Sequence, residues 1–168
     1  MLTQTDLITK KGAYIQQLFG SIAWVYDLLN TILSFNFDKS WRRFAVKVSN
    51  VTPDAKVLDV CTGTGNLAIE YSKMLNRSGK VIGSDFCHEM LKLAYNKLKE
   101  KNLSEKIDVL GADTLHLPFQ DNSFQVSAVA FGIRNVADLR AGITEMMRIT
   151  APDGHIVILE FSQPTNHI

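Results

Sequence analysis

A glycine-rich turn is the segment of this chain whose residue types best suit chemistry. An apolar run ends at Val60, Gly63 and Gly65 follow it, and an amphipathic stretch begins at Asn66. Glycine allows tight backbone geometry and the close approach of a ligand. The free N–H groups at the start of the following helix bind polar ligand groups. The segment predicts a ligand site, against the simpler alternative of a glycine turn that binds nothing.

Two acidic residues favour one ligand over another. The spacing Gly63-x-Gly65-x-x-Ala68 matches the dinucleotide fingerprint, and Asp85 follows at the expected distance of about twenty residues. The same spacing serves S-adenosylmethionine, because both ligands carry a ribose whose hydroxyl groups an acid after the second strand can bind. Asp59 lies late in the first strand, where it would repel a pyrophosphate but attract the ammonium group of a methionine moiety. Asp59 therefore favours S-adenosylmethionine as the cofactor.

Asp113 and Thr114 form a third polar group, directly after the β-rich run 107–110. Open α/β sheets bind ligands at the carboxyl edge of their strands. A carboxylate there can accept a hydrogen bond from the amino group of adenine. The alternative is a capped turn, because Asp and Thr both favour turn positions.

The spacing of apolar residues predicts a helical first third and an alternating remainder. Apolar residues recur three and four apart before Pro53, and β-rich runs alternate with helical stretches after it. Such alternation predicts an α/β fold, a doubly wound, mainly parallel sheet with helices on both faces. The expected helices are 14–33, 38–48, 66–75, 87–99 and 138–149, and the expected strands are 56–60, 80–84, 107–110, 124–130 and 155–161. We expect one domain over 1–168, with a helical cover over 1–52 and a cofactor-binding core over 53–168.

Composition excludes several classes of protein. Of the 168 residues, 46% are hydrophobic and 21% charged, as in an ordinary globular domain. The 18 Lys and Arg balance 17 Asp and Glu, so we expect no nucleic-acid partner, which usually requires clustered basic residues. Two cysteines predict free thiols and no disulfide framework, and no metal-site spacing is present. With no span of roughly 18–20 apolar residues and no targeting pattern, we expect a cytoplasmic protein.

Several longer motifs resemble those of a known family. They are Phe19-x-Ser21-Ile22-Ala23-x-x-Tyr26-Asp27-x-x-Asn30, Trp41-Arg42-Arg43, Leu117-Pro118-Phe119-x-Asp121-Asn122, Phe131-Gly132-Ile133-Arg134-Asn135-Val136 and Leu159-Glu160-Phe161-Ser162-Gln163-Pro164. Over essentially the whole chain, the sequence is similar to the C-methyltransferases of ubiquinone and menaquinone biosynthesis. The resemblance implies a class I S-adenosylmethionine-dependent methyltransferase fold, with a helical lead before a Rossmann-like sheet. It also implies transfer of a methyl group to a ring carbon of a polyprenylated quinol precursor.

The resemblance also assigns cofactor-binding positions. It places them at Thr64, Asp85, Asp113 and Thr114, beside the Asp59, Gly63 and Gly65 that the turn itself indicates. A further position of the family, a serine in many members, is Ala130 here. That hydroxyl contact is therefore absent from this chain.

Arg134 and Asn135 are the expected catalytic residues. A quinol is activated by loss of its phenolic proton, and a nearby cation stabilises the developing oxyanion. Arg134 follows the strand 124–130, but its guanidinium stays protonated and cannot act as the base. It would hold the quinolate or orient a water, and its simpler alternative is a surface ion pair. Asn135 either positions the ring or caps the turn.

The C-terminal end of the sequence suggests further expectations. Relative to the family pattern the last strands are missing, which would leave the strand 155–161 at an exposed edge. We therefore expect self-association as a homodimer, and a prenylated substrate suggests peripheral contact with the inner face of a membrane. The alternative function is a truncated, catalytically incompetent S-adenosylmethionine-binding module. A nicotinamide-dependent oxidoreductase is a third hypothesis, which Asp59 and the family motifs disfavour.

Overall fold

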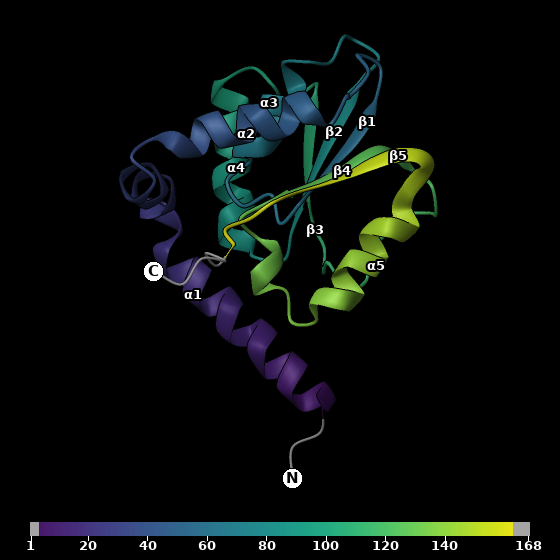
Figure 1. Ribbon diagram of the computed structural model, residues 1–168. Coiled ribbons are helices and arrows are strands. Elements are labelled where there is room, and N and C mark those ends of the chain that lie inside the picture. Colours follow the sequence, from purple (N-terminus) through teal and green to yellow (C-terminus); the bar gives the residue numbers. More distant parts are fainter. Residues whose placement is uncertain (1–3, 163–168) are drawn as a thin grey trace, which may run out of the picture.

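A five-stranded parallel sheet forms the centre of the fold (Figure 1). The computed structural model describes residues 4–162, and of residues 4–10 the backbone alone. The strands are β1 (Lys56–Val60), β2 (Lys80–Asp85), β3 (Ile107–Gly111), β4 (Phe124–Ala130) and β5 (Thr150–Leu159). They lie in the order β3-β2-β1-β4-β5, and every pair is parallel. The chain changes direction across the sheet between β1 and β4, which is where such sheets bind ligands.

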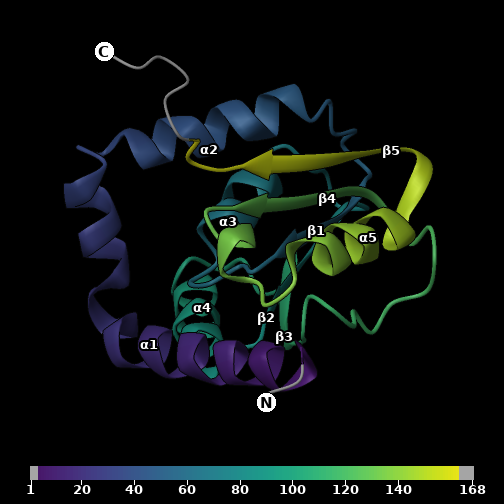
Figure 2. The same ribbon diagram turned by 60° about the horizontal axis from the view of Figure 1, so that its bottom comes forward.

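Helices cover both faces of the sheet because its central strands bury side chains on both sides (Figure 2). Val57 and Leu58 are adjacent in β1 and fully buried, yet they belong to two separate cores. Successive strand residues point to opposite faces, so one strand serves both cores. Helices α3 (Asn66–Ser72) and α4 (His88–Glu100) pack into the first core, and α5 (Leu139–Ile149) packs into the second.

Two helices precede the sheet and meet at a sharp turn. Helix α1 (Gln4–Leu33) contacts α4, and α2 (Phe37–Val48) contacts α3 and β5. Phe35 and Asn36 between the helices have positive φ angles of 49° and 65°, a conformation that ends α1 abruptly. Ala23 of α1 is buried against Cys87 and Met90. This contact holds α1 along the carboxyl edge of the sheet.

Several element boundaries differ from the sequence-based expectations for identifiable reasons. The first helix begins at Gln4 instead of residue 14, and β5 begins at Thr150 instead of residue 155. The β4–β5 pairing shifts register between Phe124 and Val126, so the intervening residues of β5, with Pro152 among them, bulge out of the ladder. A bulge tolerates proline because the missing N–H has no pairing role there. The short 3-10 helix η1 (Ile133–Asn135) was not expected.

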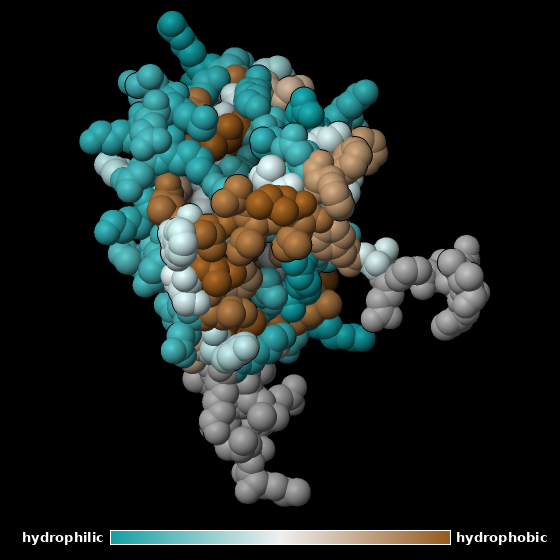
Figure 3. Space-filling view, turned by 90° about the vertical axis from the view of Figure 1, so that its left-hand side faces the viewer, coloured by the Kyte–Doolittle hydropathy of each residue, from teal (hydrophilic) through white to brown (hydrophobic). Residues whose placement is uncertain are grey.

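An exposed apolar surface lies at the turn between α1 and α2. Figure 3 shows hydrophobic side chains gathered on this face of the molecule. The elbow patch consists of Trp24, Leu28, Ile32, Leu33, Phe35, Phe37 and Phe44, all well exposed. Soluble monomers rarely expose large contiguous apolar patches, and those that exist usually bind something.

Among the described residues, no single helix has the length and apolar character to cross a membrane. The segments Lys11–Leu33 and Phe37–Val48 reach that length and apolar character only together, and a bend of 89° separates them.

Candidate cofactor site

The glycine turn has a backbone conformation that requires its glycines. Gly63 and Gly65 have φ angles of 56° and 82°, in the left-handed region where a side chain is strained. The Thr62 amide donates to Ser84 O at 2.9 Å, and the Gly65 amide donates to Thr62 O at 2.9 Å. These bonds tie the turn after β1 to the neighbouring end of β2.

Asp85 at the end of β2 supports the same turn. Its Oδ2 accepts from the Gly63 amide at 2.8 Å, and its Oδ1 accepts from the Cys87 amide at 2.9 Å. Burial raises the pKa of Asp85 above its usual value, although the hydrogen bonds from Cys87, Gly63 and Phe86 oppose this shift. Whether ionised or neutral, the Asp85 carboxyl can still accept a hydrogen bond from a ligand.

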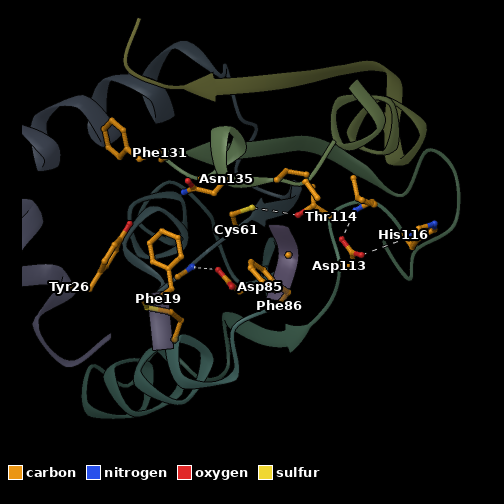
Figure 4. Close-up of a pocket in the computed structure, with 18 residues that line it drawn as sticks. Phe19, Tyr26, Cys61, Asp85, Phe86, Asp113, Thr114, His116, Phe131 and Asn135 are labelled. Carbon is orange, nitrogen blue, oxygen red and sulfur yellow. Dashed lines mark hydrogen bonds and ion pairs between the residues drawn. The ribbon is translucent and has the colours of Figure 1, made fainter. Parts of the chain in front are cut away.

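A cavity of about 440 Å³, here the main pocket, opens beside Asp85. Its walls come from α1, the glycine turn, the segment after β3 and the segment after β4. In Figure 4, Asp113 and His116 lie at one end, Tyr26 and Phe131 lie at the other, and Asp85 lies between. The pocket thus joins an acidic end to an aromatic end.

The main pocket contains most of the expected site residues. Gly63, Asp85, Asp113, Thr114, Ala130 and Asn135 line it, together with Phe19, Tyr26, Cys61, Phe86, Met90 and others. The carboxyl ends of β1 to β4 meet at one edge of the sheet, so residues more than sixty positions apart converge there.

Asp59 lies in a second, smaller space. This side cavity of about 20 Å³ shares Tyr26, Cys61, Gly63 and Ala130 with the main pocket, and its walls also include Arg42, Asp59 and Thr64. Asp59 Oδ2 accepts from Thr62 Oγ1 at 2.6 Å and from the Ala68 amide at 3.0 Å. Burial raises the pKa of Asp59 to about 7, and the positive charge of Arg42 acts against this shift.

Two expected residues lie outside both cavities. Gly65 occupies the N-cap position of α3, so its contribution is to the shape of the turn. Arg134 forms an ion pair with Glu160, and its guanidinium carbon lies 5.7 Å from the ring centre of Phe161. Phe161 stacks on Phe131 of the pocket wall. The structure therefore places Asn135 in the pocket and Arg134 one aromatic layer away from it.

A polar network anchors α1 to the glycine turn. Asp27 Oδ1 accepts from Thr64 Oγ1 at 2.6 Å and from Asn66 Nδ2 at 2.9 Å, and Asp27 Oδ2 pairs with Lys97 Nζ at 2.5 Å. Burial acts to raise the pKa of Asp27, but the hydrogen bonds from Lys97 and Thr64 outweigh it and lower the pKa. Lys97 also donates to Asn66 Oδ1 at 3.0 Å. Pattern reasoning had no signal for Lys97, because it reads as one exposed basic residue of an amphipathic helix.

Cys61 is a pocket residue that sequence reasoning missed. It has a positive φ of 53°, and its sulfur lies 3.4 Å from Thr114 Oγ1. Burial raises the pKa of its thiol to about 12. The thiol is therefore protonated at neutral pH and is no nucleophile. Within residues 4–162, no group of three His, Cys, Asp or Glu side chains is placed to hold a metal ion.

Comparison with known proteins identifies the family. The model of the ubiE/COQ5 methyltransferase family matches residues 7–168. The ubiquinone/menaquinone biosynthesis C-methyltransferase UbiE of Geotalea daltonii is 45% identical over 157 residues, which are 94% of this chain and 67% of that protein. The 2-phytyl-1,4-naphtoquinone methyltransferase of Synechocystis is 43% identical over 90% of this chain and 64% of its own length. The chain thus spans about two thirds of the length of these relatives.

Solved structures share the fold at lower identity. A SAM-dependent methyltransferase from Aquifex aeolicus aligns with a TM-score of 0.67 and 24% identity, over 76% of this chain and 68% of that one. The [4+2]-cyclase SpnF aligns with a TM-score of 0.74 and 19% identity, over 87% and 60% respectively. One fold can serve different reactions, so the family assignment rests on the family model and the curated relatives. The chain belongs to the ubiE/COQ5 methyltransferase family.

Proposed function

We propose that this chain transfers a methyl group from S-adenosylmethionine to a ring carbon of a polyprenylated quinol precursor, in menaquinone or ubiquinone biosynthesis. The observation that carries the proposal is the main pocket, whose acidic end adjoins an aromatic end within one cavity of about 440 Å³. That volume lies in the usual range for small-molecule sites. The names of the relatives, which include a demethylmenaquinone methyltransferase, support a quinone-type substrate.

The residues of the acidic end suit S-adenosylmethionine. Asp85 and Asp113 both line the pocket. In the proposed complex Asp85 accepts from the ribose hydroxyl groups, and Asp113 accepts from the adenine amino group. Asp59, in the side cavity, would bind the ammonium group of the methionine moiety. Thr114, Gly63, Thr64 and Ala130 complete the proposed cofactor contacts, and Gly65 shapes the turn that presents them.

The aromatic end suits a flat, apolar acceptor. Phe19, Tyr26 and Phe131 line the pocket, and with an acceptor bound their rings would exclude water from the space beside the cofactor contacts. When bound, S-adenosylmethionine supplies an electrophilic methyl group. Holding an acceptor in line with it is worth up to roughly 7–11 kcal/mol, because two bound reactants no longer have to meet in solution.

Asn135 and Arg134 remain the proposed catalytic residues. Asn135 lines the pocket, where its amide can hydrogen-bond a quinol oxygen and orient the ring. Arg134 supplies a positive charge close to the aromatic end, and in the structure this charge is paired with Glu160. A fixed cation beside a developing oxyanion stabilises it without reorganisation. Arg134 would therefore favour the quinolate form of the substrate and increase charge on the ring carbon.

The elbow patch is the proposed contact with a membrane. Lys39, Arg43 and Lys47 are exposed and recur four residues apart on one side of α2, beside the apolar side chains of the patch. An apolar face flanked by basic residues is typical of helices that lie in an anionic membrane surface. Trp41 stacks on Phe37 and also contacts Phe131. These ring contacts extend from the patch to Phe131 in the wall of the main pocket, and the proposed prenyl chain would lie along them.

The proposed homodimer would use β5. In the described sheet this strand pairs only with β4, and Ile158 in the strand and Phe161 after it are exposed. A second copy would satisfy the backbone groups of that edge. Size exclusion coupled to light scattering at micromolar concentration tests this proposal, and a monomer there would contradict it.

Turnover tests the proposed function directly. The protein would be incubated with S-adenosylmethionine and a reduced demethylated naphthoquinol or benzoquinol that carries a prenyl chain, and the product analysed by mass spectrometry. We expect one added methyl group on a ring carbon. Binding of S-adenosylmethionine without methyl transfer to either quinol would contradict the proposal and favour the binding module instead. Binding of NAD in its place would favour an oxidoreductase.

A further inference from the structure

Arg42 is a buried cation that the proposed reaction does not use. The residue lies on α2 and is only 6% exposed. Its Nη1 pairs with Asp38, whose carboxylate also accepts from Ser34 Oγ at 3.1 Å. Its guanidinium carbon lies 5.3 Å from the ring centre of Phe131. The Nε and Nη2 groups have no acceptor among the described residues, so this buried side chain retains hydrogen-bonding capacity.

Arg42 forms part of the wall of the side cavity. Asp59, itself 1% exposed, forms part of the same wall. The two residues form no direct ion pair in the structure, since each charge is held by its own neighbours. A positive and a negative group that line one small cavity complement a ligand carrying both an ammonium and a carboxylate.

The side cavity adjoins the main pocket. Tyr26, Cys61, Gly63 and Ala130 form part of both walls. A ligand whose nucleoside lies beside Asp85 would therefore extend its other end past Gly63 toward Arg42. An α-amino acid is the zwitterion that S-adenosylmethionine carries at that end.

We propose that Arg42 binds the α-carboxylate of the methionine moiety of S-adenosylmethionine, opposite the ammonium group at Asp59. The inference rests on the proposed function only for the identity of the cofactor. It makes α2 a contributor to the cofactor site as well as a cover over α3. Asp38 is then a positioning residue, which holds one side of the guanidinium and leaves the other side for the ligand.

A comparison of two ligands separates this role from a structural one. S-Adenosylhomocysteine carries the α-carboxylate, whereas methylthioadenosine keeps the nucleoside and the thioether but lacks the amino-acid end. Calorimetry would measure both ligands with the wild type, with Arg42→Met and with Arg43→Met. Arg43 is the adjacent but exposed arginine, and it serves as the matched control.

We expect Arg42→Met to weaken S-adenosylhomocysteine binding at least about tenfold, as the loss of a charge-assisted hydrogen bond implies. Its affinity for methylthioadenosine should stay within about twofold of the wild type, and Arg43→Met should bind both ligands normally. Equal losses for both ligands would show that Arg42 only supports the fold, and no loss for either would also overturn the proposal.

A second variant covers the case in which Arg42→Met does not fold. Arg42→Lys keeps the charge and the pairing with Asp38 but not the planar fork. We expect it to bind S-adenosylhomocysteine several-fold more weakly than the wild type, with methylthioadenosine unchanged; equal affinity for both would overturn the role. If the Arg42 variants lose affinity for S-adenosylhomocysteine but not for methylthioadenosine, and the wild type does not methylate a quinol, the proposed function is refuted and this inference stands. A wild type that binds neither ligand would refute the inference.

Discussion

The amide of Gly63 and the carboxylate of Asp85 are joined by a hydrogen bond of 2.8 Å, although 22 positions separate them in the sequence. Gly63 follows β1 and Asp85 ends β2, and the parallel pairing of these strands brings them together. The acid proposed to bind the ribose thus also holds the glycine turn in shape. Its loss should affect the cofactor site in two ways at once.

Asp85→Ala should weaken S-adenosylmethionine binding at least about tenfold. Charge-assisted hydrogen bonds are worth roughly 1.5–3 kcal/mol each, and the variant also leaves the amides of Gly63 and Cys87 without their acceptor. Calorimetry measures the affinity, and circular dichroism checks the fold. The control is Asp108→Ala, because Asp108 is an exposed acid on β3. Unchanged affinity in a folded Asp85 variant would contradict the assignment.

Asp59→Asn should stabilise the ligand-free protein at alkaline pH and lower its affinity for S-adenosylmethionine. The pKa of Asp59 is raised to about 7 from an ordinary value of 3.8. Between these values the folded state holds a proton that the unfolded state has lost. The stability that wild-type Asp59 contributes is therefore present below about pH 4 and is lost as the pH rises through 7.

The measurement for Asp59 is urea unfolding without ligand, at pH 5 and pH 8. We expect the stability of Asp59→Asn relative to the wild type to increase between these pH values by roughly 1–4 kcal/mol. Its affinity for S-adenosylmethionine should fall at pH 8, because the ammonium group loses its carboxylate. A relative stability that does not change with pH would refute the raised pKa.

Asn135→Ala should lower turnover more than cofactor affinity. Asn135 lines the aromatic end of the pocket, away from the acids proposed to bind the nucleoside. Arg134→Ala should act in the same direction, through loss of the cation. We expect kcat to fall about tenfold or more for either variant, with S-adenosylmethionine affinity within a few-fold. Loss of cofactor binding with normal turnover at saturation would show that these roles are wrong.

Asp27→Asn should destabilise the protein near neutral pH but not in acid. The pKa of Asp27 is lowered, because hydrogen bonds from Lys97 and Thr64 outweigh the effect of burial. A lowered pKa contributes stability above the ordinary value, and that stability is lost as the pH falls through the folded value. The Asp27 side chain is 42% exposed, so solvent screening limits the cost at pH 7 to roughly 0.5–1.5 kcal/mol.

The free energy of unfolding of Asp27→Asn would be measured in urea at pH 7 and pH 3. The difference from wild type should shrink at the lower pH. Glu70→Gln is the control, because its pair with Lys73, whose side chain is 57% exposed, should contribute little at either pH. An equal deficit at both pH values would mean that the network acts through packing and not through charge.

Substitutions in the elbow patch should reduce binding to anionic vesicles. Replacing Leu33 and Phe35 with Ser removes two highly exposed apolar side chains, and neutralising Lys39, Arg43 and Lys47 removes about 1 kcal/mol of attraction for each charge. Co-sedimentation with vesicles of anionic or neutral phospholipid distinguishes the two contributions. Met147→Ser, at an exposed apolar position on α5, is the control. A changed oligomeric state with unchanged vesicle binding would show that a second copy covers the patch.

The sequence by itself determined the succession of strands and helices along the chain, and it located the glycine turn after the first strand. Five short β-rich runs and their intervening helices lie close to the expected positions, because burial follows local periodicity in both kinds of element. The methyltransferase fold and the family were likewise identifiable from motifs, and the family model and the relatives confirm them. Boundaries were less accurate at β5, where a bulge accommodates Pro152.

Only the tertiary structure decided which side chains meet at the carboxyl edge of the sheet, where the pocket lies. Sequence patterns could not separate Asn135, which enters the pocket, from its neighbour Arg134, which pairs with Glu160. Nor could they bring Arg42 of α2 and Asp59 of β1 to one cavity. Local periodicity reports which face of an element is buried. The partner at that face depends on strand order and helix packing, which are settled by contacts between residues far apart in the chain.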